Sequence, residues 1–195
     1  ISCSLVGSEM CIRDRVRNND CDYAFRPDTT FSYYTGLGED YEAGAVLVLN
    51  PVDPDSADAK AGRTHEPELF VAPRANHYTQ DFFMNAHYGE YWVGPRAGLR
   101  EMTAMTGIET NDIAQLADAL SKDVGTEAGA VRVRVIREAD PQITEMVEDI
   151  RKANGFADPD GNTAADDRLH EFAAEARMCK DEYEAVSYTH LTLPT

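Results

Sequence analysis

Lysine is scarce in this sequence, and basic residues as a whole are outnumbered by acidic ones. The 195 residues include 35 Asp and Glu against 18 Lys and Arg, and the formal net charge is −17. A surface this acidic repels the phosphate backbone of nucleic acids. The composition therefore argues against nucleic-acid binding, and we expect no nucleic acid among the partners of the chain.

Cysteine is scarce too, and the four cysteines are not spaced as ligands. Cys21 and Cys179 are the two that lie outside the terminal segments, and no Cys-x-x-Cys spacing occurs. Neither a disulfide framework nor a zinc site is indicated. A His-Glu-x-x-His pair is also missing. Free thiols of this kind are typical of a reducing compartment, so we expect a cytoplasmic protein.

Long apolar runs are missing as well. The most apolar stretches, such as residues 45–49, are far shorter than the roughly 20 residues that a membrane-spanning helix needs. We therefore expect no membrane partner. A chain of 195 residues is still long enough to form one domain with a substantial core.

Three short stretches have the composition of buried or half-buried strands. Residues 45–49 and 68–72 are nearly continuous apolar runs, which is typical of a buried strand. Residues 131–136 alternate with a period of two, and this pattern places Arg132 and Arg134 on the polar face of a half-buried strand.

Capping residues and helical periodicity predict helices between these strands. One helix is expected over Leu99–Thr106, ended by Gly107, and a second begins at a cap formed by Asn111. A third opens at Pro141 and ends at Asn154-Gly155. Strands that alternate with helices predict an α/β domain with helices packed on the sheet.

Acidic clusters near the C-terminal end predict a last helix and no binding site. Residues 158–162 resemble a calcium loop, but glycine stands at the fourth position of the loop and not at the sixth, so a turn is favoured. Thr163 and Asp166 then suggest a helix cap, and the helix is expected to bury Leu169, Phe172 and Ala173. Pairs such as Asp166-Asp167 are most simply solvated helix faces.

The two ends differ in composition from the rest of the chain. Residues 1–15 show neither helical nor strand periodicity, and residues 186–195 interrupt an acidic helical segment with β-branched and hydroxyl residues. Both resemble translated adapter sequence at the edges of reading frames from assembled environmental DNA. We expect both to be non-native, with native flexible termini as the alternative.

Two ordered motifs carry the strongest functional signal. In residues 17–37, an Arg-Asn-x-Asp sequence and an aromatic-Arg pair precede an aromatic cluster that closes on Thr35-Gly36. Residues 91–96 then contain a Trp-x-Gly-x-Arg element. In this order they resemble the N-terminal domain of aminopeptidase P, the metal-dependent Xaa-Pro aminopeptidase. The residues of the first motif by themselves predict only an ordered loop with packed aromatic rings.

The resemblance implies a fold and a division of the chain. It implies a mixed β-sheet flanked by helices, as in the N-terminal domains of creatinase and aminopeptidase P. That domain would cover residues 16–162, and residues 163–185 would form a helix leading into a catalytic pita-bread domain outside this chain. There, two Asp, one His and two Glu hold a pair of divalent ions, usually Mn²⁺.

The activity implied by the resemblance is removal of the N-terminal residue that precedes proline in a peptide. Because the metal ligands belong to the catalytic domain, we expect this chain to supply no catalytic and no metal-binding residue and to be inactive alone. Two alternatives remain open at this point. One is the N-terminal domain of a prolidase- or creatinase-type hydrolase, and the other is a non-catalytic binding module with the same fold.

Trp92 and Arg96 are the candidate substrate-binding residues. The resemblance implies a homo-oligomeric full-length enzyme in which Trp92 reaches a neighbouring subunit and forms one wall of its substrate pocket. The alternative for Trp92 is core packing. Arg96 lies beside it in the same element, and anchoring of a loop carboxylate is its alternative role.

Overall fold

A computed structural model describes residues 2–7, 16–18, 21–22, 27–38, 44–53, 55–75, 77–84, 89–122, 124–125, 131–137, 139–155 and 159–178. The strands are β1 (Ser2–Gly7), β2 (Val16–Asn18), β3 (Cys21–Asp22), β4 (Val46–Pro51), β5 (His65–Val71), β6 (Glu109–Asp112) and β7 (Arg132–Val135). The α-helices are α1 (Thr29–Thr35), α2 (Ala57–Lys60), α3 (Gln80–Met84), α4 (Glu90–Val93), α5 (Leu99–Thr106), α6 (Leu116–Ser121), α7 (Pro141–Ala153) and α8 (Pro159–Met178), and a 3₁₀ turn, η2 (Ile113–Gln115), precedes α6.

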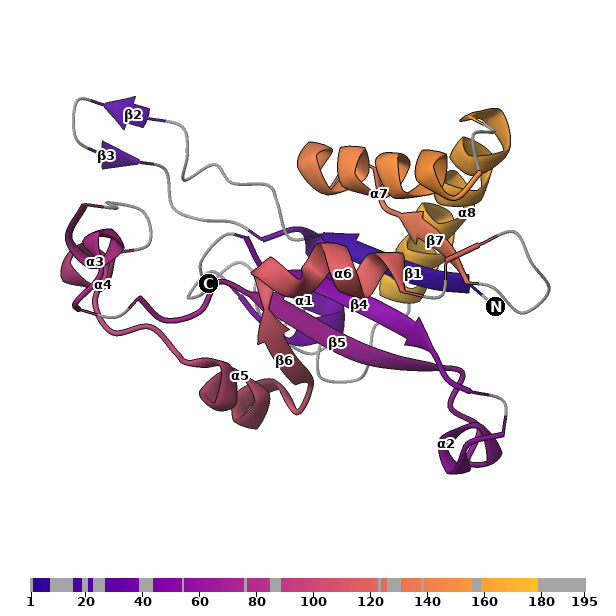
Figure 1. The fold of residues 1–195 in the computed structure, drawn as a ribbon, viewed down its shortest axis with the longest axis horizontal. Coiled ribbons are helices and arrows are strands. Elements are labelled where there is room, and N and C mark those ends of the chain that lie inside the picture. The colour runs from indigo at the N-terminus through magenta and orange to yellow at the C-terminus, as the bar shows by residue number, and fades with distance from the viewer. Residues whose placement is uncertain are drawn as a thin grey trace, which may run out of the picture.

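Five of the strands form one mixed sheet in the order β6-β5-β4-β1-β7 (Figure 1). Strands β5 and β6 are parallel, as are β1 and β7, whereas β4 is antiparallel to both β5 and β1. The register places Leu47 opposite Leu69 and Val46 opposite Phe70. The expected mixed sheet flanked by helices is therefore confirmed.

Alternation along the central strands divides the core between the two faces of the sheet. Leu47 and Leu69 are buried on one face, in a cluster that includes residues from α1, α5 and α8. Val48 and Phe70 are buried on the other face, against residues from α6 and α7. Side chains of successive strand residues point to opposite faces, so one pair of apolar strands supplies both halves of the core.

Strand β1 corrects one expectation. Residues 1–15 were expected to contain no strand, yet Ser2–Gly7 pairs with β4 on one side and with β7 on the other. Ladder hydrogen bonds join main-chain groups, so a central strand does not require the two-residue alternation on which the expectation relied. This pairing concerns the fold alone, and the expectation that residues 1–15 are non-native stays a prediction.

Helix α1 corrects a second expectation, because the aromatic stretch in residues 17–37 was expected to form a loop. The carboxylate of Asp28 accepts hydrogen bonds from the backbone N–H groups of Thr30 and Phe31, at 2.9 and 3.1 Å. Gly36 closes the helix at a φ of 71°, a conformation that glycine adopts without a Cβ penalty. Phe31 is buried between these two caps. The residues at 23–26 of the same motif lie outside the described part of the chain.

The helices predicted at residues 99–106, after residue 111, from residue 141 and near the C-terminal end are present, with shifts at their bounds. Helix α5 has the expected bounds, and α7 opens at Pro141 after the cap Asp140. The cap ahead of α6 is Asp112 and not Asn111, because residues 109–112 form the edge strand β6. Helix α8 begins at Pro159, so Asp166 lies inside the helix and caps nothing. Phe172 on α8 is exposed, whereas Ala173 is buried.

Candidate functional site

Trp92 lies on α4, in a small helical lobe made by α3 and α4 at one end of the molecule (Figure 1). Trp92 is 62% exposed, so it does not pack in the core of the described part of the chain. The indole is nevertheless held, because its Nε1–H donates a hydrogen bond to the carbonyl oxygen of Phe83 at 2.7 Å. A large apolar ring is thus fixed in place while most of its surface faces outward.

Several aromatic rings gather around Trp92. Tyr91 lies edge-to-face against the indole with ring centroids 5.2 Å apart, and Phe83 lies 5.7 Å from Tyr91. Phe82 continues the series at 4.8 Å from Phe83. Such pairs add to the stability of a cluster beyond the apolar area that they bury. We call Phe82, Phe83, Tyr91 and Trp92 the aromatic patch.

The aromatic patch stands out on an otherwise acidic surface. Phe83, Tyr91 and Trp92 are each more than half exposed, and Met84 and Tyr78 beside them are more exposed still. Single apolar residues on a surface need no explanation, but a contiguous group of this kind marks a site of interaction. The lobe can therefore offer flat apolar faces to a ligand or to another protein.

The backbone after Trp92 explains the spacing of the Trp-x-Gly-x-Arg element. Gly94 has φ 88° and ψ −177°, a conformation essentially restricted to glycine. The chain then turns so that the backbone N–H of Arg96 donates to Glu90 Oε1 at 2.9 Å. Arg74, which follows β5, forms an ion pair with the same oxygen at 2.6 Å. Trp92 thus lies on α4 and Arg96 in the turn that follows it, and Glu90 of α4 contacts both this turn and the segment after β5.

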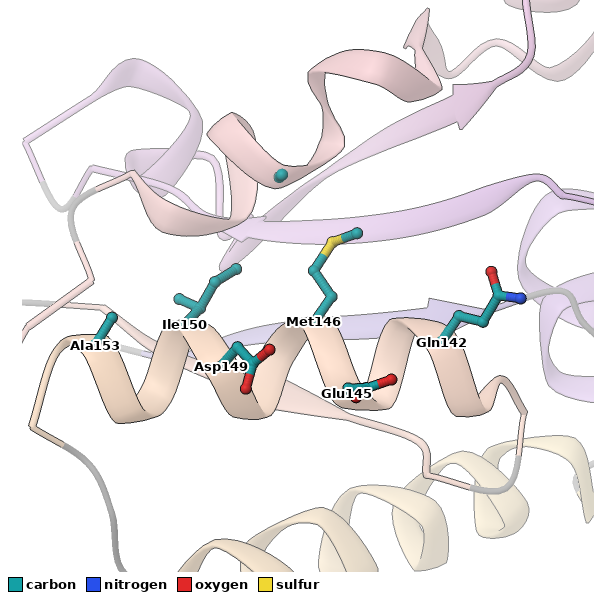
Figure 2. A pocket seen from close by; sticks show the side chains of 7 residues that line it. Gln142, Glu145, Met146, Asp149, Ile150 and Ala153 are labelled. Carbon is teal, nitrogen blue, oxygen red and sulfur yellow. The ribbon is translucent and has the colours of Figure 1, made fainter.

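A groove lies between α6 and α7 (Figure 2). It has a volume of about 720 Å³, and Met146 and Ile150 point from α7 toward α6 across it. Its carboxylates, Glu145 and Asp149, are exposed, and Asp149 pairs with Lys152 at 3.2 Å. The groove combines an apolar floor with solvated charges and brings together no set of catalytic groups.

Asp166 is a charged residue of the interior. It was expected on a solvated face, yet it is 1% exposed. Its carboxylate accepts hydrogen bonds from Arg151 Nη1 and Nη2 at 2.9 and 2.7 Å, from Arg137 Nε at 2.9 Å and from the backbone N–H of Val135 at 3.1 Å. Arg151, also buried, donates to the Val133 carbonyl oxygen as well. This cluster joins α7, α8 and β7, and all its groups are engaged with one another.

A signal for the buried cluster was present in the sequence. Asp166 lies three and seven residues before Leu169 and Ala173, so it shares their apolar helix face. Arg151 lies four residues after Val147 and likewise falls on the buried stripe of α7. Opposite charges on the apolar faces of two neighbouring helices predict a buried ion pair.

Metal binding requires several ligating side chains to lie close together. Within the described ranges, no three His, Cys, Asp or Glu side chains lie close enough together to hold a metal ion. The buried carboxylates of Asp166, Glu90 and Asp140 already accept hydrogen bonds from arginines or backbone N–H groups. The donor set of a manganese site is therefore not found in this part of the chain. Among the described helices, none is long and apolar enough to cross a bilayer.

Comparisons with known proteins agree on one family. Residues 12–132 match the family described as "Aminopeptidase P, N-terminal domain". Over 170 residues the chain is 30% identical to Xaa-Pro aminopeptidase 1 of Streptomyces coelicolor, and equally to that of Streptomyces lividans. Each match covers 87% of this chain and 29% of the relative, so the chain spans less than a third of their length.

A solved structure supports the fold. A variant of Escherichia coli aminopeptidase P superposes with a TM-score of 0.54 at 20% sequence identity. The match covers 77% of this chain and 28% of that protein. At this identity the likeness concerns the fold alone, and it agrees with the mixed sheet and its covering helices.

Proposed function

The chain belongs to the aminopeptidase P N-terminal domain family, and from this we propose that it is the non-catalytic N-terminal part of a metal-dependent Xaa-Pro aminopeptidase. The full-length protein would remove the N-terminal residue that precedes proline in a peptide. The names of the Streptomyces relatives and the small share of their length that is matched support this proposal. The domain borders expected above, residues 16–162 followed by a connecting helix over 163–185, are part of it.

The chemistry of hydrolysis is assigned to residues outside this chain. Mn²⁺ would be held in the catalytic part of the full-length protein, where it would supply Lewis-acid activation of water. The described residues offer no donor set for that ion. We propose that this chain alone is inactive and that its residues act by shaping the entrance to an active site.

Trp92 is the residue that we propose contacts substrate, and one observation carries this role. Its indole is 62% exposed and yet fixed by a hydrogen bond of 2.7 Å to Phe83. A rigid, flat apolar ring packs well against a pyrrolidine ring or a neighbouring side chain, and little conformational entropy is lost on contact. Arg96, in the same turn, is the proposed polar partner for substrate.

A second copy of the chain is the proposed occupant of the rest of the aromatic patch. Phe83 and Tyr91 extend the apolar surface beyond the part that one side chain of a substrate could cover. Contacts between copies of an oligomer bury aromatic residues of this kind at their centres. We propose a homo-oligomeric, cytoplasmic enzyme that binds proline-containing peptides and neither nucleic acid nor membrane.

The test of the substrate role is Trp92→Ala in the full-length enzyme. Removal of an aromatic contact at a binding site typically costs about 1–3 kcal/mol, so kcat/KM for Xaa-Pro peptides should fall by a factor of about 5 to about 150. Metal content, measured by elemental analysis, should stay unchanged. Phe172→Ala is the matched control, because Phe172 is 61% exposed on α8, outside the lobe. An unchanged kcat/KM in a metal-loaded Trp92→Ala enzyme of normal oligomeric state would remove Trp92 from the site.

The oligomer has its own test. Phe83→Ser and Tyr91→Ser should lower the sedimentation coefficient of the full-length enzyme, since each replaces an exposed aromatic ring of the patch with a small polar group. A coefficient that stays at its wild-type value would place the contact between copies elsewhere.

A further inference from the structure

Helix α4, which carries Trp92, is too short to be stable without contacts to other segments. It spans four residues, Glu90–Val93, and its cap Gly89 makes no side-chain hydrogen bond to the first turn. An isolated helix of this length is unstable because the first turn fixes several residues for a single hydrogen bond. The position of the indole must therefore come from contacts between α4 and other segments.

Glu90 makes such contacts with two segments at once. Its Oε1 accepts the Arg74 guanidinium from the chain that leaves β5 and the Arg96 N–H from the chain that leads to α5. The Glu90 side chain is only 7% exposed, whereas that of Arg74 is 48% exposed. A carboxylate buried to this degree is stable only when it is paired. The contacts with Arg74 and with the Arg96 N–H therefore stabilise the Glu90 side chain in its buried position.

Glu90 and Trp92 lie on opposite sides of α4. Residues two apart on a helix are separated by about 200° around the axis, so they cannot share a face. We propose that Glu90 is a positioning residue that ties α4 to the end of β5 and thereby fixes where Trp92 stands. The effect of this tie on catalysis rests on the substrate role proposed above, but the tie itself does not.

A hollow beside the tie gives the lobe room to shift when the contact is lost. Arg74, Ala75 and His77 line this hollow together with Glu90, and its volume is about 370 Å³. The turn at Gly94 brings the Arg96 N–H within hydrogen-bonding distance of Glu90. The glycine of the Trp-x-Gly-x-Arg element therefore allows one of the two contacts that Glu90 makes. The remaining bond of the indole, to the Phe83 carbonyl, stays within the lobe and cannot orient the lobe against the sheet.

The experiment uses the fact that Trp92 is the single tryptophan of the chain. Time-resolved fluorescence anisotropy of the complete 195-residue chain then reports the motion of this one side chain. In Glu90→Ala the amplitude of the nanosecond component, which reports motion of the lobe against the sheet, should rise about twofold, because released loop segments move on that timescale. Glu90→Gln keeps an acceptor oxygen for the Arg96 N–H and should stay near the wild-type amplitude.

Two further variants keep the result interpretable. Asp81→Ala removes an exposed acidic residue from α3 in the same lobe and should leave the amplitude unchanged. If Glu90→Ala does not fold, Arg74→Ala decides, because it removes the sheet side of the tie and should also raise the amplitude. A folded Glu90→Ala or Arg74→Ala chain with wild-type anisotropy overturns the proposal.

Kinetics of the full-length enzyme separate this proposal from the substrate role. A looser indole with unchanged kcat/KM would leave the tie standing and would remove the substrate role of Trp92. If Glu90 has only a structural role, Glu90→Ala lowers the thermal midpoint while the folded fraction keeps the wild-type anisotropy. That result would contradict the proposed positioning role.

Discussion

Two buried carboxylates are held by arginines in this domain, and they serve different parts of it. Asp166 lies on the buried face of α8, and its main partner Arg151 is itself buried. Glu90 lies on α4 in the aromatic lobe, and its partner Arg74 is half exposed. The first pair closes the interior between two helices and a strand, whereas the second joins a surface lobe to the end of a strand. Both carboxylates are buried, so the difference between the two pairs lies in the arginine. A buried arginine belongs to a contact that stabilises the fold, and a half-exposed arginine belongs to a contact that holds a surface lobe in position.

The sharpest test of this comparison is Arg151→Met. The change keeps an apolar stem but leaves the Asp166 carboxylate and the Val133 carbonyl short of donors in the interior. Breaking one side of a buried ion pair typically costs about 3–5 kcal/mol of unfolding free energy. Urea denaturation followed by circular dichroism measures the loss. Replacing both partners, as in Arg151→Met with Asp166→Leu, should recover much of it.

The control for Arg151→Met is Arg168→Met, an exposed arginine on α8. Its substitution should change the unfolding free energy by no more than about 0.5 kcal/mol. If Arg151→Met costs as little as an exposed pair, below about 1 kcal/mol, the interior cluster is not what holds α8 to the sheet.

A smaller effect is expected at the start of α7. The carboxylate of Asp140 accepts hydrogen bonds from the backbone N–H groups of Gln142 and Ile143, at 2.7 and 3.3 Å. Asp140→Ala should lower the unfolding free energy by about 1–2 kcal/mol, because it leaves helix donors unpaired. Asp140→Asn keeps the acceptor and should lose little. Equal losses in the two variants would mean that charge and not capping is the source of stability.

The pH dependence of Glu68 probes the sheet edge farthest from the buried ion pair. Burial, together with the negative charge of Glu109 on the neighbouring strand, raises the pKa of Glu68 above its ordinary value of 4.5. Between the ordinary and the raised pKa the folded state binds more protons than the unfolded one, so stability falls as pH rises through this window. Glu68→Gln should flatten this part of the profile and stabilise the protein at neutral pH.

Thermal midpoints from about pH 4 to about pH 7 measure the effect of Glu68, because this range begins below the ordinary pKa of 4.5 and extends above it. Glu109→Gln should shift the window toward lower pH, since it removes the repulsion across the strand pair. A Glu68→Gln profile with the wild-type slope would assign the pH dependence to other carboxylates.

The parts of the fold that the sequence predicted depend on local signals. Helix α7 followed from a cap, a proline and a terminal Asn-Gly, all within its own residues. Helix α1 was missed because Thr29–Thr35 is rich in β-branched and aromatic residues, which favour helices weakly. Burial of Phe31 against the sheet outweighs that preference, and such burial depends on residues distant in sequence.

The candidate site divides in the same way. Trp92 and Arg96 were found by their motif, but their contacts with Phe83 and Glu90 depend on how α3 and α4 fold together. Asp166 was misplaced because its partners lie 15 to 31 residues earlier in the chain. A charge is assigned to solvent by default, and only the shared face with Leu169 and Ala173 argues otherwise.

The smallest effect on stability is expected for Trp92→Ala, and it completes the comparison. The indole is 62% exposed and contacts only its own lobe in the contacts described above, so the unfolding free energy should change by about 0.5 kcal/mol or less. Phe70→Ala is the buried counterpart, because Phe70 is 1% exposed in the core and its truncation should cost about 3–5 kcal/mol. Far-UV circular dichroism is the probe, since the variant has no tryptophan. If Trp92→Ala costs as much as Phe70→Ala, the lobe folds as part of the core, and its aromatic rings serve stability and not the surface they present.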